Sequence, residues 1–192
     1  PPRSTLFPYT TLFRSATRLQ VSTGSSGNFF AQIRHGAPYE VFLSADLRYP
    51  RELIAAGAAE GDSLTLYAIG RLAIWTMRSG LDPADLAATV RHAEVRRFAI
   101  ANPAHAPYGR AAREALERAG SWEAVQPKLI FGENIAQTAQ FVQMGGADAG
   151  LVALSLVLAP HLEGVGRWAE VPADWHAPLE QGAVLTTRGA CQ

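Results

Sequence analysis

The amino-acid sequence predicts an α/β fold with parallel sheets, and two observations carry that prediction. From Ala16 onward, segments typical of strands alternate with segments typical of helices along nearly the whole chain. The composition, 48% hydrophobic and 18% charged over 192 residues, is that of an ordinary globular protein. This length suits one large domain or two small lobes.

The first half of the chain is expected to contain four strand regions separated by short helices. Pro50 stands near the start of one expected helix, where a missing backbone N–H costs little. Gly70 interrupts the longest β-rich run. In chain order, the expected segments are strand 18–23, helix 28–35, strand 40–46, helix 49–59, strand 63–77, helix 83–90 and strand 96–103.

The second half repeats this alternation. Helix 109–120 is predicted from its Ala, Leu, Glu and Arg content and its terminal glycine. Helix 134–146 has apolar residues on one face and stops at two glycines. The remaining expected segments are strand 128–133, strand 149–155 running into an apolar helix that ends at Pro160, and strand 182–189.

Three strand–loop–helix junctions are the candidate functional elements. They are STGSSGNFF at 22–30, IANPAHAPYGRAA at 100–112 and IFGENIAQTAQ at 130–140. In open α/β sheets, ligands bind beyond the carboxyl ends of strands, where helix starts present unpaired N–H groups and a partial positive charge. Hydroxyls and amides there suit a compact oxyanion. Plain helix capping or a linker explains the same residues, and His105 would border a cleft at the second junction.

Several function classes lack support in the sequence. The formal net charge is zero and no basic patch suggests a nucleic-acid partner. No nucleotide-binding or hydrolase motif is present, and the five histidines show no metal-ligand spacing, so we expect neither an enzyme nor a cofactor. Asp46 follows a strand without an evident partner, and we expect it to cap a helix. Cys191 has no second cysteine to pair with, and the longest apolar run, 149–159, is too short to span a membrane.

The segment from Pro1 to Ser15 stands apart from the rest. Its TLFPYTTLFRS run resembles the in-frame translation of a sequencing adapter, so we interpret residues 1–15 as an assembly artefact. An aromatic strand is the alternative. If the artefact replaces the native start, a secretion signal would not be visible in this sequence.

The junctions carry a resemblance to a known family. GSSGNFFAQIRHGAPYEVFLSAD resembles the signature region of the periplasmic molybdate-binding proteins of ABC transporters, and LYAIGRLAIW, NPAHAPYG, GENIAQTAQFV and GLVALS follow in the order of that family. The resemblance covers 16–189. It implies a type II periplasmic-binding-protein fold, with two α/β lobes and a ligand cleft between them. Lobe 1 would comprise 16–66 plus 181–192 and lobe 2 would comprise 67–180, with hinges near Tyr67 and Gln181.

The resemblance also implies a site and a role. Ser26 would hold an anion oxygen through its hydroxyl and amide, with Ser25 as a helper, while Tyr108 and Ile135 would each give a backbone N–H. The ligand would be molybdate, and we expect tungstate as well, with no cofactor and with molybdenum present only as the oxyanion. The partner would be a membrane permease, the location periplasmic and the chain a monomer.

Departures from the family leave alternatives open. The family's first strand, its following loop and its first helix are missing, a ligand tyrosine of one branch is replaced by Ala153, and the chain stops early, so we expect a fragment at both ends. The same fold could bind sulfate or a carboxylate. A carboxylate receptor usually has an arginine in its cleft, and none lies within the three junction loops themselves, since Arg110 comes just after the loop of the second junction. The effector-binding domain of a transcription regulator is a further alternative.

Overall fold

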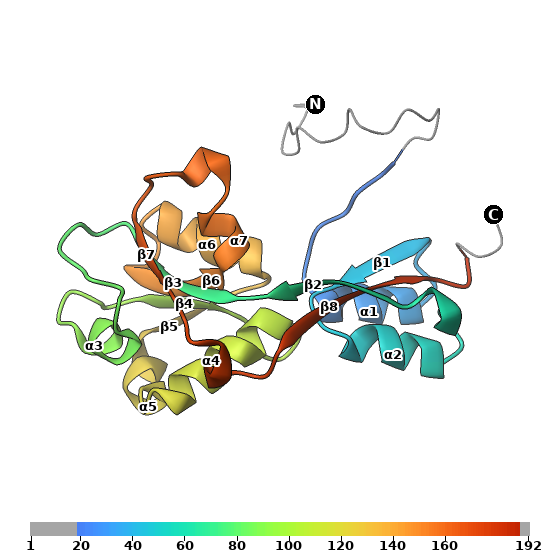
Figure 1. Ribbon diagram of the computed structural model, residues 1–192, viewed down its shortest axis with the longest axis horizontal. Helices are drawn as coiled ribbons and strands as arrows, with labels where there is room; N and C mark the ends of the chain where they lie inside the picture. The colour runs from blue at the N-terminus through green and yellow to red at the C-terminus, as the bar shows by residue number, and fades with distance from the viewer. Residues whose placement is uncertain (1–18, 189–192) are drawn as a thin grey trace.

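The computed structural model describes residues 19–188, so the adapter-like segment 1–15 and Cys191 lie outside the described residues. Two β-sheets lie at opposite ends of an elongated molecule (Figure 1). We call the three-stranded sheet with helices α1 (Ser26–Arg34) and α2 (Arg48–Ala55) lobe 1. The five-stranded sheet with its helices is called lobe 2.

Lobe 1 is a small antiparallel sheet with helices on one face. Its strand order is β1 (Val41–Ser44), β8 (Leu179–Leu185) and β2 (Thr65–Gly70). Helices α1 and α2 both pack on the same side of this sheet (Figure 1). The core between them is formed by Ile33, Phe42, Tyr49, Leu53, Ala59 and Val184.

Lobe 2 is built on a mixed sheet rather than the parallel sheet that the sequence predicted. Its order is β5 (Leu129–Gly132), β4 (Phe98–Ala101), β6 (Ala149–Ala153), β3 (Leu72–Thr76) and β7 (Arg167–Glu170). Strand β4 is parallel to β5 and β6, whereas β3 is antiparallel to both β6 and β7. The expectation of parallel sheets is therefore wrong for lobe 1 and for β3. The pairings of β3 with β6 and β7 therefore do not follow the βαβ pattern that parallel neighbours require.

Helices cover both faces of the lobe 2 sheet. One face carries α3 (Leu86–Arg91), α4 (Pro107–Arg118) and α5 (Trp122–Val125), and the other carries α6 (Ile135–Gln143) and α7 (Leu154–Val157) (Figure 1). All residues of β3 are buried: Leu72 and Ile74 face one core, and Ala73 and Trp75 face the other. Within residues 19–188, none of the helices is both long and apolar enough to cross a bilayer.

Most of the expected elements are present, and the main error falls on the first strand. Residues 19–25 have no regular secondary structure, and Leu19 and Val21 are 57% and 73% exposed. A strand needs a neighbour to pair with, and no strand within residues 19–188 pairs with this segment. The sequence interpretation also missed α5 and β7. The predicted lobe boundaries at Tyr67 and Gln181 fall inside β2 and β8, the strands that join the sheets, and stay a prediction.

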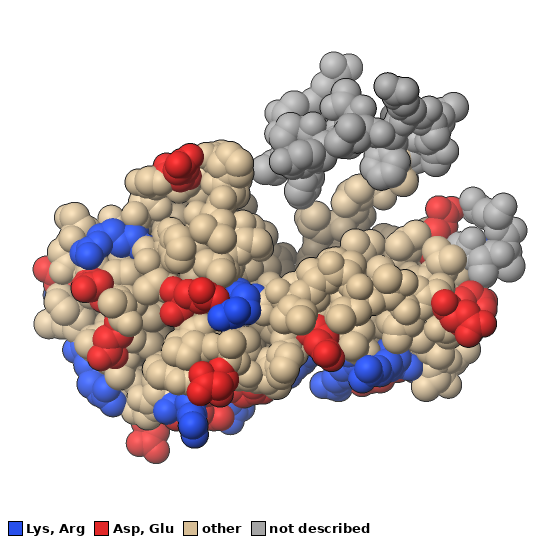
Figure 2. Space-filling model, viewed as in Figure 1, with Lys and Arg blue, Asp and Glu red and all other residues tan. Residues whose placement is uncertain are grey.

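Charged side chains are dispersed over the surface. Figure 2 shows Lys and Arg interspersed with Asp and Glu on both lobes, without a broad field of one sign on this face. The chain has 17 basic and 17 acidic residues, so these charges balance.

Candidate anion site

The first junction ends in two buried serines at the start of α1. Ser25 is the N-cap, and its Oγ accepts a hydrogen bond of 3.3 Å from the backbone N–H of Asn28. Ser26 is the first helical residue, and its Oγ accepts a 2.9 Å hydrogen bond from the backbone N–H of Ala45 in lobe 1. Because this bond uses a lone pair of Ser26, the hydroxyl proton of Ser26 is left to donate elsewhere.

The second junction delivers the start of α4. Pro107 is the first residue of this helix and Tyr108 the second. Within residues 19–188, the backbone N–H of Tyr108 finds no hydrogen-bond acceptor, as expected for the first turn of a helix. The Tyr108 phenol points instead to the joining strand β8, where it accepts a 3.0 Å hydrogen bond from Gln181 Nε2. Burial raises the pKa of Tyr108 and the Gln181 hydrogen bond opposes that rise, so the phenol stays neutral at physiological pH.

The third junction repeats the arrangement at α6. Asn134 is the N-cap, and its Oδ1 accepts a 2.9 Å hydrogen bond from the backbone N–H of Gln137. Ile135 follows as the first helical residue, and its side chain packs against the core of lobe 2. In the described part of the chain, the backbone N–H of Ile135 has no hydrogen-bond acceptor. This N–H is therefore a second donor of lobe 2 that is not used by the fold.

His105 brings the three junctions together. Its Nδ1 lies 2.9 Å from Ser25 Oγ in lobe 1, and its carbonyl oxygen accepts a 2.9 Å hydrogen bond from the backbone N–H of Gly27. Its Nε2 lies 3.9 Å from Glu133 at the third junction. The sequence placed His105 only at the border of a cleft, whereas the structure puts it in contact with both other junctions. Ser25 is thus engaged by both Asn28 and His105, which suits a supporting role, while Ser26 keeps its proton free.

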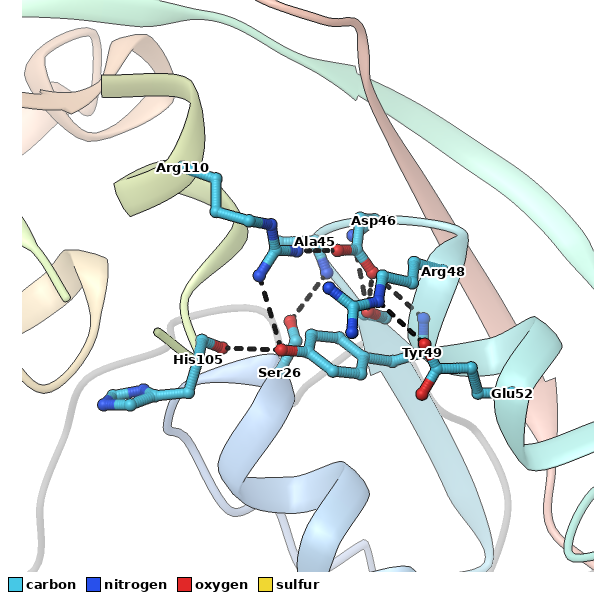
Figure 3. Close-up of polar contacts among 9 residues, drawn as sticks. Ser26, Ala45, Asp46, Arg48, Tyr49, Glu52, His105 and Arg110 are labelled. Atoms are coloured by element: carbon cyan, nitrogen blue, oxygen red, sulfur yellow. Dashed lines mark hydrogen bonds and ion pairs between the residues drawn. The ribbon is translucent and has the colours of Figure 1, made fainter. Parts of the chain in front are cut away.

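An ion pair next to these junctions was not foreseen. Arg110 on α4 donates to Asp46 of lobe 1 and to Tyr49 Oη at 3.4 Å (Figure 3). Asp46 also accepts a 3.2 Å hydrogen bond from the backbone N–H of Tyr49 in the first turn of α2, although the N-cap of that helix is Leu47 and not Asp46 as the sequence suggested. The expectation that Asp46 has no partner is wrong. The pair is 64 positions apart in the sequence, and no local pattern connects its members.

The local chemistry is that of uncharged donors. The guanidinium of Arg110, which lies at the second junction, is neutralised by Asp46. In the region covered by residues 19–188, no cluster of three or more His, Cys, Asp or Glu side chains could hold a metal ion. The arrangement offers backbone N–H groups, a hydroxyl and the positive ends of three helices, which together can hold an anion without a fixed cation.

Comparison with known proteins identifies relatives over most of the chain. Residues 11–192 match the model of a family described as bacterial extracellular solute-binding protein. The molybdate-binding protein ModA of Azotobacter vinelandii is 41% identical over 169 residues, which are 88% of this chain and 66% of the relative. The ModA of Rhodobacter capsulatus is also 41% identical over 169 residues, covering 87% of this chain and 64% of the relative. The chain thus spans just under two thirds of the length of these relatives.

A solved structure resembles the fold closely. The periplasmic molybdate-binding protein of Azotobacter vinelandii superimposes with a TM-score of 0.80 at 35% identity, covering 86% of this chain and 72% of that one. A periplasmic thiamin-binding protein, at 13% identity and a TM-score of 0.65, shares the fold alone. The fold is therefore the two-lobed type II periplasmic-binding-protein fold that the sequence predicted, and these relatives are binding proteins rather than enzymes.

Proposed function

The chain belongs to the bacterial extracellular solute-binding protein family, and from that premise we propose that it binds molybdate between its two lobes as the receptor of an ABC transporter. The proposal is supported by relatives named as molybdate-binding proteins at 41% identity. In this role the protein makes and breaks no covalent bond, because the receptor takes up the oxyanion and releases it to a membrane permease. The location we propose is the periplasm, where the structural relative is described.

One observation carries this proposal more than any other. Donors that the fold leaves unused stand at the three junctions that His105 connects: the Ser26 hydroxyl from lobe 1, and the backbone N–H groups of Tyr108 and Ile135 from lobe 2. A fully ionised dianion can accept all of these hydrogen bonds, and each helix start adds a favourable dipole. Donor-only groups also discriminate against hydrogen phosphate, whose proton would find no acceptor among them.

Tungstate is the second ligand that we propose, because it has the charge and tetrahedral shape of molybdate. Sulfate has the same shape and charge but is smaller, so we propose that cavity size separates it from the larger anions. Calorimetric titration of the chain with molybdate, tungstate and sulfate tests this ranking directly. Tight binding of sulfate, or no binding of molybdate and tungstate, would contradict the proposed function.

The Ser26→Ala variant tests the site itself. Loss of a hydrogen bond to a charged ligand is expected to weaken molybdate binding by about 1–3 kcal/mol, roughly 5- to 150-fold in the dissociation constant. Ala45 N–H would also lose its acceptor, so the melting temperature of the ligand-free variant measures the structural share of the change.

Ser25→Ala is the matched control at the neighbouring position. Because Ser25 caps α1 and contacts His105, its loss is expected to cost about 1 kcal/mol of stability and to weaken binding less than the loss of Ser26. An unchanged dissociation constant for Ser26→Ala would remove Ser26 from the site.

A further inference from the structure

The two lobes are in direct contact along a seam beside the candidate anion site. In lobe 1 the seam consists of the first turn of α1, the loop after β1 and the first turn of α2. These face the loop 102–106 and the first turn of α4 in lobe 2. His105 O accepts hydrogen bonds from Gly27 N–H at 2.9 Å and from Tyr49 Oη at 3.4 Å. Figure 3 shows Arg110 reaching from α4 across this seam to Asp46 and Tyr49.

The Arg110–Asp46 pair is unusual among the ion pairs of this molecule. Of those found within residues 19–188, it is the one that crosses between the lobes, whereas the others join groups of the same lobe. The side chains of Arg110 and Asp46 are only 27% and 15% exposed, so solvent screens the pair less than an ordinary surface pair. The guanidinium also lies over the ring of Tyr49, 5.5 Å from its centroid. Three contacts therefore fix Arg110 on lobe 1.

Asp46 connects this pair to the ligand serine through the backbone. Its carboxylate accepts hydrogen bonds from Ser44 Oγ and from the Tyr49 N–H, which hold the loop between β1 and α2 in shape. The preceding residue, Ala45, donates its N–H to Ser26 Oγ at 2.9 Å. Arg110 thus binds the same loop that orients the Ser26 hydroxyl. Two residues earlier on α4, Tyr108 presents its unused backbone N–H.

We infer that Arg110 and Asp46 are positioning residues of the anion site, forming an interlobe latch that holds the Ser26 and Tyr108 donors together and slows release of the bound oxyanion. This inference rests on the proposed function and names residues that act through other groups rather than on the anion. Donors from two lobes hold a ligand only while the lobes stay together, so a contact that stabilises the closed arrangement lengthens the lifetime of the complex.

The tightness of the seam supports a role in closure. A Cβ atom at Gly27 would lie 2.6 Å from both His105 O and Tyr49 Oη, closer than real Cβ atoms approach such groups. Any side chain at Gly27 must therefore move the lobes apart or distort α1. By contrast, a Cβ at Gly61, which lies outside the seam, would meet only Ile54 at an ordinary 3.6 Å. The Gly27→Ala substitution is accordingly expected to push the two lobes apart at the seam, and Gly61→Ala is its control.

Release kinetics test the latch on the whole chain. Arg110→Met removes the charge while keeping side-chain length, and Arg113→Met is the matched control, because Arg113 pairs with Glu117 within α4 itself. Chasing radiolabelled molybdate with unlabelled molybdate is expected to show about tenfold faster release for Arg110→Met and less than twofold change for Arg113→Met. Asp46→Asn should match Arg110→Met, and the double variant should release no faster than either single one. Multiplying effects in the double variant, or equal release from Arg110→Met and Arg113→Met, would overturn the latch.

Small-angle scattering of the ligand-free chain gives a readout that does not depend on the ligand. Arg110→Met, Asp46→Asn and Gly27→Ala are expected to raise the radius of gyration, while Arg113→Met and Gly61→Ala should not. If the chain binds neither molybdate nor tungstate, the proposed function fails and scattering still decides the latch: expansion confined to the seam variants supports it, and an unchanged radius of gyration overturns it.

Discussion

The two lobes each combine one sheet with helices, but they differ in how fully their sheets are covered. In lobe 2, helices lie on both faces, and every residue of β3, β4 and β6 is buried. In lobe 1, α1 and α2 cover one face only. On the other face, Val41, Leu43 and Leu185 are 51%, 60% and 39% exposed. Within residues 19–188, no helix or strand packs on that face of lobe 1.

The difference shows that an apolar run in the sequence does not by itself decide whether both faces of a strand are buried by helices. The run VFLS of β1 is apolar at successive positions, a pattern typical of strands buried on both faces. The same kind of run in β4, FAIA, is fully buried because α4 and α6 pack on either side of it. In β1 only the inward Phe42 and Ser44 are buried. Stability is therefore expected to be concentrated in lobe 2.

The sharpest test compares two fully buried leucines, one in each lobe. Leu151 lies in β6 and Leu53 in α2, and both are 0% exposed. Leu151→Ala is expected to cost about 4 kcal/mol, because its neighbours are fixed from both faces and cannot close the cavity. Leu53→Ala is expected to cost about 2 kcal/mol, because a thin lobe relaxes more easily.

Urea denaturation followed by tryptophan fluorescence and by circular dichroism measures both losses. All four tryptophans, Trp75, Trp122, Trp168 and Trp175, belong to lobe 2, so their fluorescence reports that lobe. Equal losses for Leu151→Ala and Leu53→Ala would show that the covered and the half-covered lobe are equally well packed.

A buried carboxylate, Asp148, makes the stability of lobe 2 depend on pH. Asp148 accepts hydrogen bonds from the backbone N–H groups of Arg96 and Arg97 at 2.8 Å and from the Arg78 side chain. Burial raises the pKa of Asp148, but these hydrogen bonds outweigh it and hold the pKa below its usual value. A carboxyl with a lowered pKa in the folded state stabilises the fold above about pH 4 and loses that contribution as the pH falls through the folded-state pKa.

Asp148→Asn is therefore expected to cost about 2 kcal/mol at neutral pH and less as the pH drops below about 4. Denaturation midpoints of the variant and the parent chain, measured from pH 7 down to pH 3, check this convergence. The exposed Asp62 of lobe 1 supplies the control, since Asp62→Asn should change neither the midpoint nor its pH dependence. A constant difference between Asp148→Asn and the parent at all pH values would rule out the carboxylate as the cause.

The sequence predicted elements well where a single segment decides the outcome. The expected helices 28–35, 109–120 and 134–146 are present as α1, α4 and α6, but α1 and α4 begin two residues earlier than expected, at Ser26 and Pro107. These earlier starts agree with an N-cap serine before Ser26 and with a proline in the first turn, whose chemistry is local. The candidate donors at Ser26, Tyr108 and Ile135 came from the family resemblance, and their roles stay predictions.

What the sequence could not predict depends on contacts between distant segments. Residues 18–23 carry a strand-like pattern, but a strand exists only where another pairs with it. The Arg110–Asp46 pair joins residues 64 positions apart on different lobes, and the position of His105 among three junctions likewise follows from tertiary structure alone. Such pairs become visible only once the sheets place the loops side by side.

The smallest expected change in stability concerns the exposed sheet face of lobe 1, and it tests whether that face is truly uncovered. Leu43→Thr keeps a residue that favours strands while removing an exposed apolar side chain. Because Leu43 is 60% exposed, the free energy of unfolding is expected to change by less than about 0.5 kcal/mol. Light scattering at high protein concentration should show less self-association, since exposed apolar sheet faces promote it. A loss above about 1 kcal/mol, or one that grows with protein concentration, would mean that this face is covered in solution. Stability would then no longer be concentrated in lobe 2.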